Sequence, residues 1–207
     1  MANCEENCRR YRSTLFFIFL MFLIIGNIHC RRPRFQAYDG TWWVNTPLDQ
    51  RLGFIDGFVD CYTYGSRKEE KLQKPRNWYQ AAVSAYYEKN GGEMLVGQAL
   101  IRVAETLEAS SLAGQGSPNE ARPNGAFDGT VWLKYSEKER IGFVEGYLNA
   151  LMPQTSRLTS FPKNPQYYAD AISKRYETSR VDRDDSVKQR IGEILWGMRN
   201  RGQQASK

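Results

Sequence analysis

Histidine is almost absent from this chain of 207 residues: the single one is His29. Ser-His-Asp triads, Cys-His pairs and zinc sites with histidine ligands all need that residue in the folded domain. Because His29 lies beside an N-terminal apolar run, we exclude these sites from the rest of the chain. A phosphate-binding glycine loop is also missing, since neither Gly91-Gly92 nor Gly114-Gln-Gly116 is accompanied by the strand and lysine that it requires. We therefore predict no cofactor, no metal ion and no identifiable catalytic residue.

Cysteine and concentrated positive charge are scarce as well. Three of the four cysteines, Cys4, Cys8 and Cys30, belong to the N-terminal segment, which leaves Cys61 alone in the remainder. That remainder has no internal disulfide and must be held by an ordinary hydrophobic core. The net charge of +6 comes from 29 scattered Lys and Arg residues against 23 Asp and Glu residues. Without a dense basic stripe, we predict no nucleic-acid partner.

Residues 1–30 are predicted to be a signal peptide or an N-terminal membrane anchor. The apolar run Leu15–Ile25 is shorter than the roughly 20 residues of a bilayer-spanning helix and is typical of an export signal. An uncleaved anchor remains an alternative, because the chain lacks small residues at a cleavage site before Cys30. A lipoprotein anchor at Cys30 is less favoured, because His29 stands where a small residue is expected. We expect an exported chain whose N-terminal segment engages the membrane: periplasmic, secreted or membrane-anchored.

A long motif occurs twice. The segment Asp39–Phe58 returns 89 positions later as Asp128–Tyr147, and both copies contain Asp-Gly-Thr, a tryptophan and Arg-x-Gly-Phe-x-acid-Gly-aromatic. We interpret this as a tandem duplication. The predicted parts are a first repeat at 38–109, a linker at 110–127, a second repeat at 128–198 and a frayed tail at 199–207.

Each repeat is predicted to contain three helices, so the fold class is all-α. The first helices begin after the caps Thr46-Pro47 and Ser136, the second occupy 75–88 and 164–177, and the third occupy 93–107 and 186–198. We expect one six-helix body, with two loosely joined domains as the alternative. The short Thr-Trp-Trp-Val and Thr-Val-Trp-Leu segments before the first helices are β-prone. We predict them to be extended, with a pairing between the two copies left open.

The first helix of each repeat contains two glycines four residues apart, Gly53 and Gly57 in one copy and Gly142 and Gly146 in the other. Each glycine costs a helix about 1 kcal/mol relative to alanine. The usual compensation is the close approach of another helix. We therefore predict that the first helices are central and covered on two sides.

Asp56 and Glu145 are the polar pair that both first helices keep between their glycines. One hypothesis makes them a carboxylate pair for a cation, a sugar or a basic partner group. The alternative is a structural role, in a solvated stripe or in salt bridges. Further candidate binding residues are Asp60, Trp42 and Trp132.

Arg51 and Arg140 project into the apolar arc of the first helices, where an arginine packs its methylenes on the core and directs its head to a carboxylate. We predict structural contacts with Asp39 and Asp128, respectively. The same repeated residues, together with the glycine pairs and the tryptophans Trp42 and Trp132, are predicted to be architectural.

The repeated motifs Arg-Leu-Gly-Phe-Ile-Asp-Gly-Phe and Arg-Ile-Gly-Phe-Val-Glu-Gly-Tyr resemble those of a group of uncharacterised exported bacterial proteins. This likeness covers most of residues 38–198. The succession of a glycine-containing helix, a tyrosine-bearing helix and an Ala-Leu helix is also similar, in architecture, to small helical periplasmic immunity proteins of type VI secretion amidase effectors. Those domains usually carry cysteines that this chain lacks, and no functional residue transfers.

Three functions follow as hypotheses. The first is non-catalytic binding to another protein or to an envelope component, including an immunity-like role. The second is a carboxylate-based hydrolase of cell-wall polysaccharide that uses Asp56 and Glu145. The third gives the repeated motifs a role in folding alone.

Overall fold

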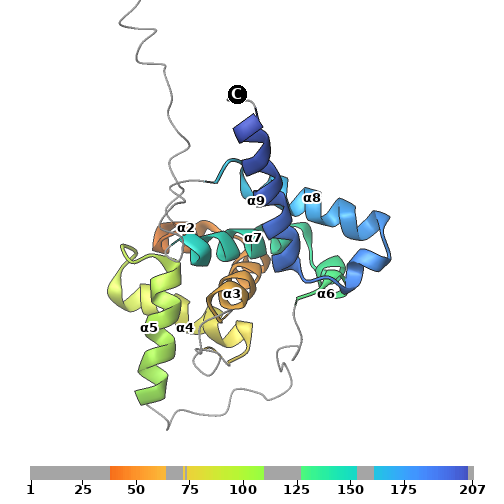
Figure 1. The fold of residues 1–207 in the computed structure, drawn as a ribbon. Coiled ribbons are helices and arrows are strands. Elements are labelled where there is room, and N and C mark those ends of the chain that lie inside the picture. The colour runs from red at the N-terminus through yellow and green to blue at the C-terminus, as the bar shows by residue number, and fades with distance from the viewer. Residues whose placement is uncertain (1–37, 64–71, 73, 110–126, 153–160, 205–207) are drawn as a thin grey trace, which may run out of the picture. The chain divides into compact units, whose positions relative to one another are not determined.

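The computed structural model describes residues 38–63, 72, 74–109, 127–152 and 161–204. This part of the chain forms eight α-helices and one 3-10 helix, without a strand, which confirms the all-α fold class (Figure 1). The first repeat contains α2 (Gly40–Asn45), α3 (Leu48–Thr63), α4 (Arg76–Asn90) and α5 (Val96–Ala109). The second contains α6 (Gly129–Lys134), α7 (Glu137–Leu151), α8 (Pro165–Thr178), the 3-10 helix η3 (Val181–Asp184) and α9 (Val187–Gln204).

The described helices belong to one compact unit. Apart from η3, the elements follow one another in the same order in both repeats, while the tandem duplication itself remains an interpretation of the sequence. None of these helices is both long and apolar enough to cross a membrane. The predicted signal or anchor at 1–30 lies outside the described residues, as does most of the predicted linker at 110–127.

The segments predicted to be extended before the first helices are helical instead, as α2 and α6. Asp39 caps α2 by accepting a hydrogen bond from the backbone N–H of Trp42 at 3.0 Å. Asp128 caps α6 through the N–H groups of Thr130 at 2.9 Å and Val131 at 3.0 Å. The prediction was wrong because a cap and the burial of a tryptophan outweigh a weak β propensity in so short a segment.

The residues before these short helices form isolated bridges inside each repeat. Asp39 pairs with Leu95 and Asp128 pairs with Ser186, in both cases antiparallel. Each bridge joins the start of a repeat to the start of its third helix, so the two copies do not pair through these segments.

Two of the predicted helix starts are confirmed by their caps. Ser136 and Glu139 form the predicted capping box of α7, and Asn164 caps α8 with proline at its first turn. Thr46 differs from its prediction: its buried hydroxyl donates to the carbonyl of Trp42 at 2.6 Å, so it closes α2 instead of capping α3. The α2 helix leaves C-terminal carbonyls unpaired, and this hydroxyl satisfies one of them.

The α3 and α7 helices make the most extensive contact among the described elements, and α4 packs on α3 as α8 packs on α7 (Figure 1). The contact between α3 and α7 brings their backbones against each other. A β-carbon at Gly57 would overlap the carbonyl oxygen of Phe143, and one at Gly146 would overlap that of Phe54. Gly53 and Gly142 meet Glu139 and Gln50 in the same way. The prediction that the glycine-containing helices are central and closely approached is confirmed.

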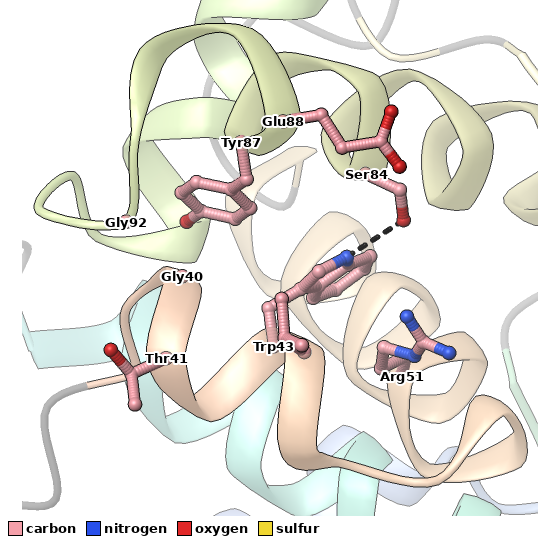
Figure 2. Close-up of a pocket in the computed structure, with 9 residues that line it drawn as sticks. Gly40, Thr41, Trp43, Arg51, Ser84, Tyr87, Glu88 and Gly92 are labelled. Carbon is pink, nitrogen blue, oxygen red and sulfur yellow. Dashed lines mark hydrogen bonds between the residues drawn. The ribbon is translucent and has the colours of Figure 1, made fainter.

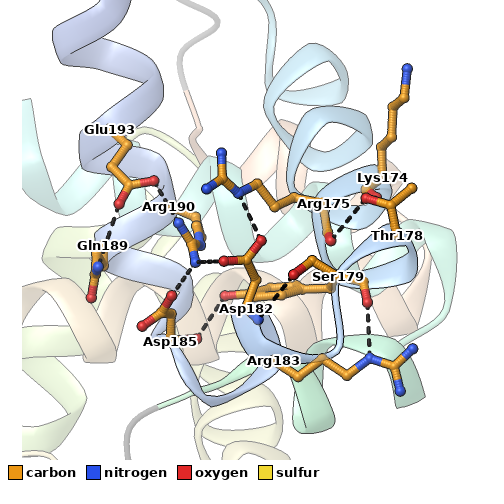
Figure 3. Close-up of polar contacts among 11 residues, drawn as sticks. Lys174, Arg175, Thr178, Ser179, Asp182, Arg183, Asp185, Gln189, Arg190 and Glu193 are labelled. Carbon is orange, nitrogen blue, oxygen red and sulfur yellow. Dashed lines mark hydrogen bonds and ion pairs between the residues drawn. The ribbon is translucent and has the colours of Figure 1, made fainter.

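The connections before the third helices differ between the repeats. In the first repeat the turn passes through Gly91, whose φ of 79° favours glycine. In the second repeat η3 takes the place of this turn. Arg190 of α9 is only 4% exposed and binds η3 through an ion pair (Figure 3). Its guanidinium pairs with Asp182 at 2.7 Å, with Glu193 at 2.7 Å and with Asp185. This cluster therefore holds the longer connection of the second repeat in place.

The α9 helix continues to Gln204, beyond the predicted end of the third helix at Met198. The predicted tail therefore begins as helix, since residues 199–204 contain no proline and good helix formers such as arginine and glutamine. The remainder, 205–207, lies outside the described residues.

Candidate binding site

The two carboxylates that the repeat places between glycines lie inside the α3–α7 contact. Asp56 is 5% exposed and Glu145 is 6% exposed. A carboxylate buried this far is stable only when hydrogen-bond donors or charges compensate for lost hydration. The two positions are compensated in different ways, so the sequence correspondence does not extend to their chemistry.

Asp56 is held by two donors. Its Oδ2 accepts a hydrogen bond from the hydroxyl of Tyr135 at 2.7 Å and an ion pair from Nη1 of Arg76 at 3.0 Å. Arg76 also pairs with Glu139 at 3.1 Å and lies over the ring of Tyr135. Burial lowers the pKa of Arg76, but the charge of Asp56 and its neighbours outweighs burial and the pKa is raised. Asp56 therefore joins α3 to α4 and to the start of α7.

The environment of Glu145 supplies fewer hydrogen-bond donors than that of Asp56. Its Oε2 accepts one hydrogen bond from the side-chain amide of Gln50 at 2.8 Å. Burial raises the pKa of Glu145 to about 7, against the smaller opposite effects of the Gln50 hydrogen bond and the charge of Lys138. The repeat explains the difference: Thr46 and Pro165 occupy the positions that correspond to Tyr135 and Arg76. Neither supplies a donor to Glu145, because the Thr46 hydroxyl is used in α2 and proline has no side-chain donor.

Asp60 is a further predicted binding residue. Asp60 lies half-buried one turn after Asp56, and the neighbouring Cys61 is a buried thiol whose pKa is raised to about 12 by burial and, less, by Asp60. Among the residues that the structure describes, no cluster of His, Cys, Asp and Glu side chains is arranged to hold a metal ion. This part of the chain therefore gives no support to a cation site at Asp56 and Glu145.

The repeated tryptophan is Trp43, not Trp42. The indole N–H of Trp43 donates to Ser84 at 2.9 Å, and that of Trp132 donates to Ser173 at 3.0 Å. Both pairs obey the 89-residue offset of the repeat, which would have identified Trp43 from the sequence. Trp42 packs in the core against Tyr38 and Phe54, with ring centroids 5.0 Å and 5.1 Å apart. Trp42 and Trp132 are both buried, so neither offers a face to a sugar.

The predicted contacts of Arg51 with Asp39 and of Arg140 with Asp128 are wrong, because both aspartates cap short helices. Arg140 instead donates three hydrogen bonds, each of 3.2 Å, to the carbonyls of Trp132 and Leu133 and to the hydroxyl of Ser173. The C-terminal carbonyls of α6 need donors that the short helix cannot supply. Arg140 therefore ties α6 to α7 through backbone carbonyls.

Arg51, the counterpart of Arg140, makes none of these bonds. Its guanidinium lies over the ring of Trp43 at 5.5 Å. No described residue accepts a hydrogen bond from it, and its Nε is buried without an acceptor. A single substitution between the repeats accounts for the missing bond to serine. The hydroxyl of Ser84 accepts bonds from Trp43 and from Gln80 at 3.2 Å, whereas Ala169 stands in the place of Gln80 and leaves Ser173 open to Arg140.

An open pocket of about 410 Å³ lies beside Arg51, between α2, α3, α4 and the turn at Gly92 (Figure 2). Its polar lining includes Arg51, Ser84 and Glu88, and Val44 on its rim is 71% exposed. The Trp43 ring is 0% exposed, so it supports the guanidinium from below and does not itself face a ligand. Pockets of this volume are typical of small-ligand sites. Sequence reasoning did not find this site, because its signal is the difference between Gln80 and Ala169 and not a shared motif.

Comparison with protein-family models, curated proteins and solved structures found no match to this chain.

Proposed function

We propose that this chain is a non-catalytic binding protein of the cell envelope and that it binds its ligand at the pocket beside Arg51. The observation that carries the proposal is the guanidinium of Arg51, which lines an open pocket and has no hydrogen-bond acceptor among the described residues. An unpaired arginine beside an open pocket provides donors for a ligand at no cost in protein contacts.

The polysaccharide hydrolase receives no such support. A glycosidase needs two carboxyl groups that flank a substrate bond in an accessible cleft. Asp56 and Glu145 are buried between α3 and α7, and neither lines the pocket. Their hydrogen bonds fasten helices together, which supports a structural role for both.

The location in the envelope is part of the proposal and rests on the apolar run Leu15–Ile25. A protein partner, as in the immunity-like version of the hypothesis, rests on the architectural resemblance alone. The partner class that the pocket supports is a small ligand, or a small group of a larger envelope component.

The experiment uses the full-length chain with an envelope fraction that contains wall polysaccharide. Retention of the chain by the fraction and release of soluble saccharides are measured together for wild type, Val44→Glu at the pocket rim and Lys174→Ala on exposed α8. We expect retention that Val44→Glu lowers and Lys174→Ala keeps, without release of saccharides. Saccharide release that depends on the chain, or equal retention of all three proteins, would contradict the proposal.

A further inference from the structure

We propose that the pocket beside Arg51 binds the carboxylate of a peptide-like acid, a singly charged carboxyl group followed by an amide. This inference rests on the proposed function and names the ligand class of its site. Four observations support it. Arg51 has no acceptor among the described residues, Ser84 accepts no bond from Arg51, the charges of the pocket lining balance, and the corresponding Arg140 of the second repeat does have acceptors.

The Nε of Arg51 is buried without an acceptor, and its guanidinium donates no hydrogen bond to a described residue. A guanidinium has five N–H donors in a planar fork that matches a carboxylate. In the second repeat, Arg140 directs three of these donors at protein oxygens. In the first repeat the described residues supply no acceptor, although Nε is buried and the guanidinium lies over the Trp43 ring at 5.5 Å. A planar anion in the pocket would pair with the guanidinium donors that face it.

Ser84 adds a second donor. Its oxygen accepts hydrogen bonds from Trp43 and Gln80, which fills both of its acceptor sites. Its own proton has no acceptor among the described residues, unlike that of Ser173, which donates to the carbonyl of Ala169 at 2.7 Å. The O–H of Ser84 and the guanidinium of Arg51 both belong to the pocket lining, where both are donors for one carboxylate (Figure 2).

Glu88 restricts the class of anion. It lies four residues after Ser84 and therefore on the same face of α4. The charged residues in the lining are thus one arginine and one glutamate, with no excess of positive charge. Glu88 would repel a phosphate dianion more strongly than a monocarboxylate, and a monocarboxylate pairs with one guanidinium. Glu88 then offers an acceptor to an N–H group of the same ligand, as the amide of a peptide terminus provides.

The test is a titration of the full-length chain in mild detergent, followed by the NMR signal of the Trp43 indole N–H, which lies under Arg51. The probes are N-acetyl-alanyl-alanine, its C-terminal amide and inorganic phosphate. We expect the acid to bind with a Kd of about 1 mM, typical of so small a ligand. The uncharged amide and phosphate should each bind at least about tenfold more weakly, since they lose or oppose the charge-assisted pair.

Three variants assign the binding to this arginine. Arg51→Gln should weaken binding of the acid about tenfold or more. Gln80→Ala should also weaken it, because Ser84 then becomes free to accept a bond from Arg51 as Ser173 does from Arg140. Arg140→Gln is the matched control and should leave the affinity within about twofold of wild type. The inference is overturned if the amide binds as well as the acid, if phosphate binds more tightly, or if Arg51→Gln binds the acid as wild type does.

Its failure is distinguishable from that of the proposed function. If the envelope fraction retains the chain in a manner that depends on Val44 but the peptide acid does not bind, the ligand class is wrong and the binding function stands. If the fraction fails to discriminate the rim variant, the proposed function itself is contradicted.

Discussion

Gly57 lies against the main chain of Phe143, so closely that a single methyl group at Gly57 would overlap the carbonyl oxygen. The reciprocal relation holds between Gly146 and Phe54. This mutual fit brings α3 and α7 together and buries Asp56 and Glu145 between them. The repeated glycines and the repeated carboxylates are therefore parts of one helix contact.

Gly57→Ala should lower the free energy of unfolding by about 3 kcal/mol, because a fixed backbone carbonyl cannot move away from the added methyl group. The matched control is Gly192→Ala on α9, where nothing lies within 4 Å and alanine should stabilise the helix by about 0.5–1 kcal/mol. Denaturation with urea measures both. Equal effects of the two substitutions would show that α3 and α7 are not in backbone contact.

Asp56→Ala should lower the free energy of unfolding by about 3–5 kcal/mol, since it leaves Arg76 without one partner and Tyr135 without its acceptor. Asp49→Ala is the control on the same helix. Asp49 accepts a bond from Ser136 at 2.9 Å near the surface, and its loss should cost less than about 1 kcal/mol. If Asp56→Ala were as mild as this control in the same urea experiment, Asp56 would be free for another role.

Glu145→Gln should change the pH dependence of stability. The pKa of Glu145 is about 7 in the folded chain, whereas a glutamate in an unfolded chain titrates near about 4.3. Between these values the folded chain holds a proton that the unfolded chain has lost, so stability falls as the pH rises through this window. Above this pH window the folded chain bears the full cost of burying the ionised carboxylate of Glu145. The variant cannot ionise and should gain about 3–4 kcal/mol over wild type between pH 4 and pH 8.

Thermal or urea unfolding across that pH range measures the difference, with Glu105→Gln on exposed α5 as control. The control should parallel wild type throughout. A Glu145→Gln profile that also parallels wild type would mean that Glu145 titrates normally.

Asp128 should act as a cap and not as a partner of Arg140. Asp128→Ala should lower the free energy of unfolding by about 1 kcal/mol, and Asp128→Asn by much less, because asparagine also caps. In a double-mutant cycle with Arg140→Gln the two effects should add within about 0.5 kcal/mol. A coupling energy well above this value would restore the Asp–Arg contact that the sequence suggested.

The sequence predicted the six long helices and the close approach of α3 because glycine spacing and helix caps are local signals with direct structural causes. It failed at α2 and α6, where the β propensity of Trp-Trp-Val competes with an aspartate cap and with burial of the indole. It also gave Arg51 and Arg140 the same partner type. Identical residues at equivalent positions were treated alike, whereas Gln80 and Ala169, distant in sequence, decide whether the neighbouring serine accepts a bond from the arginine.

The candidate site was missed for the same reason. A search for what both repeats keep finds the residues that both repeats need for folding, and Asp56 and Glu145 proved to be buried in the helix contact. The signal for the site beside Arg51 is a residue that differs between the repeats, since the first has Gln80 where the second has Ala169. Differences such as Gln80 against Ala169 acquire meaning only once the hydrogen bonds of Ser84 and Ser173 are known.

The most direct test measures stability and ligand binding on the matched variants Arg51→Gln and Arg140→Gln of the full-length chain. Arg140→Gln should lose about 2–3 kcal/mol of stability with its three hydrogen bonds and keep its affinity for N-acetyl-alanyl-alanine. Arg51→Gln should stay within about 1 kcal/mol of wild type in stability and bind about tenfold or more weakly. The account is contradicted if both variants lose stability and neither loses binding.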